Sequence, residues 1–346
     1  MYLVEGTLKI KYKEIIMIPD TSAYPITTCG IYITRKCNLS CKHCSVRKPD
    51  VPCNEMRLSD WQRAFRILKS RGIEKVSILG GEATVYEGLR DLVRYNSESV
   101  GLDLAVVSNS MSDDEIYINL VKAGLTRFSS SIDVVAGDSF DSCSAAKSRR
   151  AWEVLKLMKE VGVPHLTGYC VLRPENADQI ERILGLLSAQ GIWMYILPFH
   201  ASVGDHWQTR GRNLPKAFED EDKSMLEDFC SRMIALKEGG ALLSNTVEYL
   251  QFLPEFAINL DWHCAPVISE LRIDADGVLM SCNDIKGEHL SRYTVFSLED
   301  DDNITKILEA RAKDSANCSG CYWPSHYHAE QLRYRQSGEH WIWQND

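Results

Sequence analysis

The 346-residue sequence has no hydrophobic run approaching the roughly 18 residues that a membrane-spanning helix needs. Its first residues, 1–13, mix Glu and Lys among apolar residues and have no signal-peptide core. Basic residues are also in deficit. There are 39 Lys and Arg against 48 Asp and Glu, a net charge of -9, which argues against a nucleic-acid or anionic-membrane surface. We therefore expect a cytoplasmic protein that binds neither nucleic acid nor membranes.

The sequence is well supplied with cysteine, which occurs 12 times. Because the cytoplasm keeps thiols reduced, these residues are expected to be metal ligands rather than disulfide partners. Seven of them fall into two spaced groups, the first formed by Cys37, Cys41 and Cys44 and the second by Cys264, Cys282, Cys318 and Cys321.

The first group has the spacing C-x3-C-x2-C and follows the apolar run at residues 31–33, where a strand is expected to end. Three thiolates on one loop can hold three irons of a cubane cluster and leave the fourth iron open to an outside ligand. A structural zinc ion would normally need a fourth protein ligand. His43 is poorly placed for that role because it is adjacent to Cys44. A zinc site and buried cysteines remain as alternative interpretations.

This loop resembles the signature of the radical S-adenosylmethionine (SAM) superfamily, C-x3-C-x-Φ-C, with His43 where an aromatic ring usually stands. The resemblance implies that Cys37, Cys41 and Cys44 hold a [4Fe–4S] cluster whose open iron binds S-adenosylmethionine. It also implies that the reduced cluster cleaves this cofactor and releases a 5′-deoxyadenosyl radical.

Short apolar segments alternate with helical patterns from residue 31 to about residue 200. Strands are expected at 31–34, 76–79, 102–107, 128–132, 166–172 and 193–197, and helices at 58–70, 87–95, 113–123, 146–161 and 176–190, the last with Asn176 as its N-cap. This alternation predicts an α/β fold, a partial (β/α)6 barrel, with functional groups after the carboxyl ends of the strands. The expected domains are a lead-in at 1–30, the barrel at 31–200 and a bridging region at 201–263 with helices at 216–237 and 245–252.

The loop after the second expected strand reads Gly80-Gly81-Glu82. The glycines can approach a ligand closely and adopt positive φ, and Glu82 offers a carboxylate to an ammonium group. By resemblance this element binds the amino group of S-adenosylmethionine. The resemblance also assigns Ser108 and Ser131 to the ribose or carboxylate of the cofactor, Arg149 to its carboxylate, and the strand of Tyr195 to the adenine.

The second cysteine group surrounds a predicted hairpin at residues 271–281, which turns at Asp276-Gly277 and precedes a helix at 303–311. Four thiolates arranged in this way suit zinc or an iron–sulfur cluster. The arrangement is similar to the twitch extension of radical SAM enzymes, the short form of the SPASM domain. That resemblance implies a small α+β unit at 264–346, with a second, auxiliary [4Fe–4S] cluster held by Cys264, Cys282, Cys318 and Cys321.

The resemblance implies an enzyme of oxidoreductase or epimerase type that acts on a small hydroxylated or amino-bearing metabolite. The auxiliary cluster would conduct electrons, and a flavodoxin or ferredoxin would supply them. The short lead-in leaves no room for a leader-binding module, in agreement with a small substrate. Cys170 lies on a barrel strand and is the candidate hydrogen donor for an epimerase, with a buried core cysteine as the alternative. A peptide maturase and a non-catalytic metal-binding protein are the other hypotheses.

Overall fold

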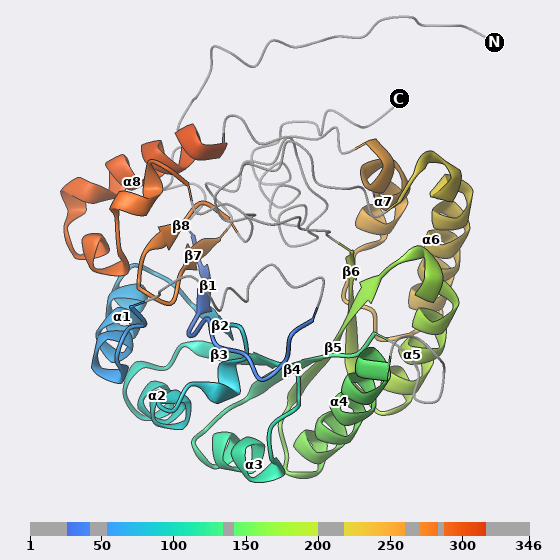
Figure 1. Cartoon of the computed structure of the whole chain (residues 1–346), viewed down its shortest axis with the longest axis horizontal. Helices are drawn as coiled ribbons and strands as arrows, with labels where there is room; N and C mark the ends of the chain where they lie inside the picture. Colours follow the sequence, from blue (N-terminus) through green and yellow to red (C-terminus); the bar gives the residue numbers. More distant parts are fainter. Residues whose placement is uncertain are drawn as a thin grey trace, which may run out of the picture.

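A computed structural model describes residues 26–41, 54–133, 142–199, 218–259, 270–282 and 287–315 of the chain. The strands are β1 (Thr28–Tyr32), β2 (Lys75–Leu79), β3 (Asp103–Ser108), β4 (Arg127–Ser131), β5 (His165–Leu172), β6 (Trp193–Pro198), β7 (Leu271–Ile273) and β8 (Leu279–Met280). The α-helices are α1 (Leu58–Ser70), α2 (Leu89–Tyr95), α3 (Asp114–Lys122), α4 (Ser142–Glu160), α5 (Ala177–Ala189), α6 (Lys223–Glu238), α7 (Val247–Asn259) and α8 (Asp301–Ser315). Figure 1 shows the helices around the outside of a curved sheet.

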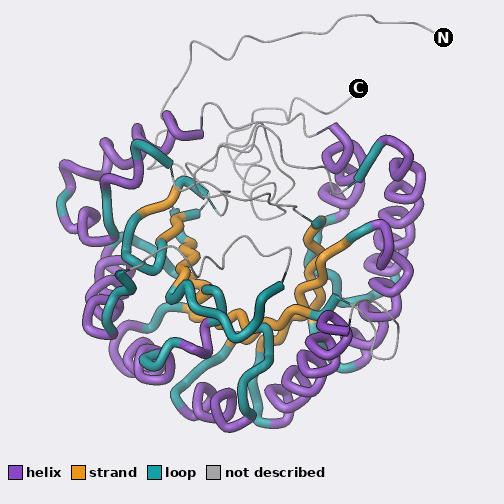
Figure 2. The backbone as a smooth tube through the Cα atoms, viewed as in Figure 1, coloured by secondary structure: helices purple, strands orange, loops and turns teal. Residues whose placement is uncertain are grey.

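The strands form one eight-stranded sheet in the order β6-β5-β4-β3-β2-β1-β7-β8. Strands β1 to β6 pair with their neighbours in parallel, and each of the first five is followed by helices that return the chain to the next strand. Figure 2 shows the strands as an inner arc with the helices outside it. The predicted α/β partial barrel is therefore confirmed.

Strand β1 differs most from its prediction, because it begins at Thr28 and ends at Tyr32 rather than at Thr34. The chain stays attached to the sheet for one more residue, since the Ile33 backbone N–H donates to the Leu79 carbonyl over 2.9 Å. The residues after Ile33 leave the sheet and begin the loop that carries the first cysteines.

Helix α1 illustrates why these segments become helices. Its residues Trp61, Phe65 and Leu68 recur at intervals of three and four and are completely buried, so one face of the helix packs on the sheet. The helix ends where Gly72 takes a left-handed conformation with φ of 82°, a conformation that glycine adopts without steric cost.

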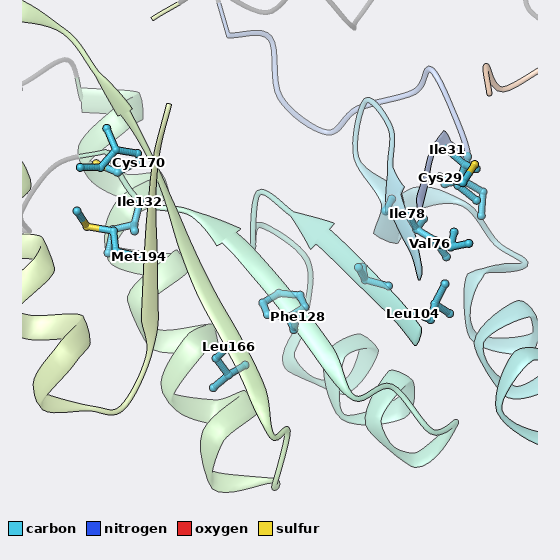
Figure 3. Packing of buried hydrophobic residues seen from close by; sticks show 14 of the residues in the cluster. Cys29, Ile31, Val76, Ile78, Leu104, Phe128, Ile132, Leu166, Cys170 and Met194 are labelled. Carbon is cyan, nitrogen blue, oxygen red and sulfur yellow. The ribbon is translucent and has the colours of Figure 1, made fainter. Parts of the chain in front are cut away.

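The main core lies between the sheet and its outer helices. In strands β2 to β6, alternate side chains enter it, such as Val76, Leu104, Phe128, Leu166 and Met194 in Figure 3. The intervening side chains point to the concave inner face of the sheet. This alternation decides which of the candidate residues can reach a ligand inside the barrel.

The predicted hairpin is present as β7 and β8, with the turn residue Gly277 at φ of 83°. Its placement adds something that the sequence did not predict. Strand β7 pairs in parallel with β1, so the hairpin extends the barrel sheet. The segment that follows the hairpin is held to helix α1, because the Arg63 Nε donates to the Glu299 carboxylate over 3.0 Å.

The other edge of the sheet is covered by the segment before α7. The side chain of Asn245 behaves like a short strand, because its amide accepts from the Ile196 N–H at 2.8 Å and donates to the Ile196 carbonyl at 2.9 Å. Helix α7 starts at Val247 and continues past the predicted end at residue 252 as far as Asn259. Among the described residues, no helix has the length and apolar character needed to cross a membrane.

Candidate active site

The first cysteine loop begins at the carboxyl end of β1 and is braced by the carboxylate of Glu55. One oxygen of Glu55 accepts hydrogen bonds from the Thr34 hydroxyl at 2.6 Å and from the Arg35 backbone N–H at 2.9 Å. The Thr34 hydroxyl in turn accepts from the Lys36 N–H at 3.0 Å. These contacts fix the backbone immediately before Cys37.

The loop after β2 lies directly against this cysteine loop. The Gly81 N–H donates to the Thr34 carbonyl, and the Glu82 N–H donates to the Lys36 carbonyl, both over 2.8 Å. A methyl group on Gly81 would lie 2.2 Å from the Lys36 oxygen, and one on Gly80 would lie 2.9 Å from the Thr34 oxygen. The close approach expected of these glycines is thus made to the cysteine loop. Neither glycine has the positive φ that the sequence suggested.

The carboxylate of Glu82 is buried and occupied by the protein itself. It accepts hydrogen bonds from the Thr84 N–H at 3.1 Å, the Thr84 hydroxyl at 2.6 Å, the Ser108 hydroxyl at 2.7 Å and the Asn109 N–H at 2.6 Å. Three of these donors reach Oε1 and one reaches Oε2, so Oε2 keeps a position for a further donor. These contacts join the end of β3 to the loop after β2. The pairing of Glu82 with an ammonium group and the contact of Ser108 with the cofactor stay predictions.

Asn109, directly after β3, places an N–H donor beside Cys37. Its amide nitrogen lies 2.8 Å from the Asn38 side-chain oxygen and 3.7 Å from the Cys37 sulfur. The Leu39 backbone N–H is 3.4 Å from the same sulfur. Hydrogen bonds of this kind stabilise a thiolate and orient it. The sequence offered one signal for Asn109, its position in a polar cluster at a strand end.

Behind Cys41, a buried ion pair joins β4 to helix α4. The Lys147 ammonium lies 2.7 Å from Asp133, and both side chains are less than a tenth exposed. Burial alone would lower the pKa of Lys147. The charge and hydrogen bond of Asp133, together with the negative charge of Cys41, outweigh burial and raise this pKa. The Lys147 ammonium therefore stays charged, and its charge interacts with that of Cys41.

Arg149, predicted to pair with the cofactor carboxylate, is exposed on α4. Two helical residues turn the side chain by about 200°, so Lys147 and Arg149 lie on opposite sides of the helix. The buried cation at this place is Lys147, which the sequence analysis did not select.

Asn176 occupies the N-cap position of α5, as predicted, but its side chain makes no capping bond to that helix. It is buried, donates to the carbonyls of Asp133 at 3.0 Å and Val171 at 2.9 Å, and accepts from the Arg173 N–H at 2.8 Å. Asn176 thus ties the ends of β4 and β5 together.

Ser131, Tyr169 and Tyr195 lie in one register row across β4, β5 and β6, on the inner face of the sheet. The rings of Tyr169 and Tyr195 are 5.7 Å apart. Both phenols have raised pKa values, chiefly because they are buried. Ser131 is the last residue of β4 and Tyr195 the third of the six residues of β6, and the cofactor contacts expected of them stay predictions.

Cys170 points the other way, into the core between β5 and the helices (Figure 3). A methyl group on Gly168, two residues earlier on the same face, would meet Leu187 of α5 at 2.6 Å. Burial and the charge of Asp133 raise the pKa of Cys170. The placement fits a core cysteine and does not support the predicted role of hydrogen donor to a substrate inside the barrel.

In the second cysteine group, Cys282 is buried just after β8. Helix α8 holds this segment, because the Arg311 Nε donates to the Ser281 carbonyl over 3.0 Å. Asp314 also accepts a hydrogen bond from the Ser281 hydroxyl at 3.1 Å. The remaining predicted ligands and contacts lie outside the described residues: His43, Cys44, Cys264, Cys318 and Cys321.

Residues 31–187 match the family model described as the Radical SAM superfamily. The chain carries a radical SAM domain. This domain uses a [4Fe–4S] cluster and S-adenosylmethionine, the cofactors of the superfamily.

Comparisons with individual proteins agree. The chain is 22% identical to a probable GTP 3′,8-cyclase of Thermoplasma volcanium, over 54% of this chain and 58% of that protein. It is 22% identical to the sporulation killing factor maturation protein SkfB of Bacillus subtilis, over 86% of this chain and 69% of that protein. Its fold is similar to that of SuiB of Streptococcus suis, with a TM-score of 0.60 and 18% identity, covering 84% of this chain and 66% of SuiB. The chain spans little more than half of the first relative and about two thirds of the other two.

The described residues fit these cofactors. Cys37 and Cys41 have partly exposed thiols on a braced loop at the carboxyl ends of parallel strands. Two N–H groups approach the Cys37 sulfur, and the Lys147 ammonium faces the charge of Cys41. Iron–sulfur clusters are held by such thiolates and tuned by such donors, and a cation suits the carboxylate of S-adenosylmethionine.

Proposed function

We propose that this enzyme cleaves S-adenosylmethionine reductively and takes a hydrogen atom from a small hydroxylated or amino-bearing metabolite, with net dehydrogenation or epimerisation. The observation that supports this most is the seating of the Cys37–Cys41 loop on Gly80 and Gly81, at the carboxyl ends of a partial barrel. When bound, the cluster and cofactor supply a 5′-deoxyadenosyl radical that abstracts the hydrogen atom.

The chain's own residues would bind and orient these groups. Cys37, Cys41 and Cys44 would ligate the cluster, and His43 would lie beside it. Lys147 would neutralise the cofactor carboxylate, because its ammonium is buried and interacts electrostatically with Cys41. Gly80, Gly81 and Glu82 would hold the cysteine loop in place, while Ser131 and Tyr195 would line the inner face next to the nucleoside.

A small polar substrate is supported by the side chains of the inner face, where phenols, hydroxyls and a buried guanidinium gather. Unactivated carbon–hydrogen bonds in such a substrate must be brought close to the radical and shielded from water, which a barrel interior can do. Epimerisation would need a hydrogen-atom donor, and with Cys170 in the core that atom would come from another side chain of this protein. An electron from the auxiliary cluster together with a proton would balance the step equally.

The second candidate function is the maturation of a ribosomally synthesised peptide. It is favoured by the similarity to SkfB along most of this chain and by the fold of SuiB, which has been solved bound to its precursor peptide SuiA. A peptide substrate would have to reach the same inner face of the sheet.

We further propose that Cys264, Cys282, Cys318 and Cys321 hold an auxiliary [4Fe–4S] cluster in a unit spanning residues 264–346. Its four ligands would leave no iron free for substrate, so it would conduct electrons to or from a substrate radical. A flavodoxin or ferredoxin would reduce the first cluster. Arg311 and Asp314 hold Ser281, the residue directly before Cys282, which supports a rigid ligand at this position.

The experiment that tests the substrate class measures 5′-deoxyadenosine formation above the substrate-free rate. The anaerobically reconstituted protein is given S-adenosylmethionine, dithionite and either sugars and aminocyclitols or candidate precursor peptides. The proposal predicts stimulation by a small molecule, together with loss of hydrogen from that molecule or its inversion. Stimulation by a peptide alone would replace the first candidate with the second.

A further inference from the structure

A buried arginine with incomplete hydrogen bonding lies on the inner face of the sheet. Arg272 of β7 pairs in register with Gly30 of β1, and its guanidinium lies across that glycine. A methyl group on Gly30 would be 1.7 Å from the Arg272 Nη1. Because Cys29 and Ile31, on either side of Gly30, point into the outer core, the guanidinium belongs to the barrel interior.

The hydrogen bonding of Arg272 is only partly accounted for by the protein. Its Nη2 donates to the Glu270 carboxylate over 2.6 Å. Its Nε is buried and has no hydrogen-bond partner among the described residues, and the whole residue is only 5% exposed. An unmet donor in a buried guanidinium is costly, and in native proteins such a group usually meets a ligand or a bound water.

Two phenols lie within the electrostatic reach of this guanidinium. The charges of Arg272 and Glu270 both act on Tyr169 and on Tyr195, whose rings pack together on β5 and β6. The Ser129 hydroxyl acts on the Tyr169 phenol as well and lowers its pKa. Strands β4, β5, β6 and β7 therefore direct hydroxyl and guanidinium donors to one region inside the barrel.

We propose that Arg272, with Tyr169 and Tyr195, binds an oxyanion of the substrate, either a carboxylate or a phosphate group. A guanidinium suits both groups because its N–H donors match their oxygens in geometry and charge. Glu270 competes with the substrate for the same guanidinium and limits its affinity for anions. This inference rests on the proposed function, since it places the substrate inside the barrel.

The test uses the reconstituted protein saturated with S-adenosylmethionine, so that the cofactor already occupies its own subsite. Inorganic phosphate and acetate are the probes, and sodium chloride at equal ionic strength is the reference. Thermal unfolding midpoints and titration calorimetry measure binding. Phosphate acting more strongly than acetate indicates a phosphorylated substrate, and the reverse indicates a carboxylate.

We expect one or both anions to stabilise the wild-type protein more than chloride does. Glu270→Gln should bind the anion more tightly, because it removes the competing carboxylate. Arg272→Met and Arg272→Lys should bind it about tenfold more weakly or not at all. Arg63→Met, which removes an exposed arginine paired with Glu299, is the matched control and should respond to anions as the wild type does.

The proposal is wrong if neither anion stabilises the wild type or Glu270→Gln beyond the chloride reference. It is also wrong if the Arg272 variants keep the wild-type response. Should Arg272→Met fail to fold, Arg272→Lys and Glu270→Gln still decide the question. Substrate-free formation of 5′-deoxyadenosine by the wild type tests the proposed function separately, since it requires no anion site.

Discussion

At the scale of single residues, two buried carboxylates near the carboxyl ends of the strands form hydrogen bonds or ion pairs within the protein. Glu82 accepts hydrogen bonds from Thr84, Ser108 and Asn109. Asp133 pairs with Lys147. Lys147 is the cation among these groups, and its charge interacts with that of Cys41. We therefore expect the affinity for S-adenosylmethionine to depend on Lys147.

Replacing Lys147 by methionine should therefore weaken S-adenosylmethionine binding about tenfold or more, because a charge-assisted contact to a carboxylate is lost. The change also leaves Asp133 buried without its cation, which costs about 3–5 kcal/mol of folding free energy. Equilibrium dialysis of the folded fraction measures the affinity. Lys147→Arg keeps the charge and should retain much of it.

Arg149→Met is the matched control on the same helix. Since Arg149 is exposed, its loss should change the affinity for S-adenosylmethionine by less than about twofold. If Arg149 proves essential and Lys147 dispensable, the proposed role of Lys147 is wrong. The cofactor carboxylate would then bind Arg149, as the sequence analysis predicted.

At the scale of elements, two loops and a hairpin support one another around the first cysteines. The loop after β2 holds the cysteine loop through backbone hydrogen bonds. Arg35 of the cysteine loop forms a buried ion pair with Asp274 at the end of β7. The C-terminal hairpin therefore helps to position the first cysteine group as well as Cys282.

Gly81→Ala should disrupt the cysteine loop, because its methyl group would lie 2.2 Å from the Lys36 carbonyl oxygen. We expect the variant to lose at least half of the iron of the first cluster, about two of its four atoms, when iron is counted after reconstitution. The control is Gly185→Ala in the interior of α5, where no atom lies within 4 Å of the added methyl group.

Gly185→Ala should keep its iron and unfold at a slightly higher temperature, since alanine favours a helix over glycine by about 0.5–1 kcal/mol. Equal iron contents in the two glycine variants would show that the contact between Gly81 and the cysteine loop is dispensable.

Helix α8 is fixed to the segment at 287–290 by Asp314. Burial alone would raise the pKa of Asp314, but N–H donors of Leu290 and His289, the His289 ring and the Ser281 hydroxyl outweigh it, so the pKa lies below its usual value of 3.8. A carboxyl group whose pKa is lowered on folding stabilises the protein above its unfolded pKa. That stability is lost as the pH falls through the folded pKa.

Asp314→Asn should accordingly lower the free energy of unfolding by about 1–3 kcal/mol at neutral pH. The difference from the wild type should shrink below about pH 4, where the wild-type carboxyl group also becomes protonated. Urea unfolding at several pH values measures this. A difference that does not depend on pH would mean that the charge of Asp314 contributes nothing.

Much of this architecture follows from local sequence patterns. Helix α1 has the predicted bounds, and β5 and β6 differ from theirs by one residue, because buried positions recur with the period of each element. The pairing of β7 with β1 could not be predicted, since it joins segments more than 240 positions apart. The same limit applies to the bonds of Glu82 with Ser108 and Asn109, which depend on the pairing of β2 with β3. It also applies to the placement of Arg272 across Gly30.

At the scale of the whole molecule, the barrel and the C-terminal hairpin share one sheet, with a cysteine group at each. If both groups hold [4Fe–4S] clusters, the reconstituted protein should contain about eight irons per chain. If the second group holds zinc, about four irons and one zinc are expected. Metal analysis of the wild type and of Cys282→Ser, which should lose only the second set, distinguishes these outcomes.

The central claim is that the loop of Cys37, Cys41 and Cys44 makes this chain cleave S-adenosylmethionine. The most direct measurement is the amount of 5′-deoxyadenosine that the anaerobically reconstituted protein forms with S-adenosylmethionine and dithionite. The wild type is predicted to form it in the absence of substrate, and Cys41→Ser to form none. A wild-type protein that contains a full first cluster and binds S-adenosylmethionine, yet forms no 5′-deoxyadenosine, would contradict the claim.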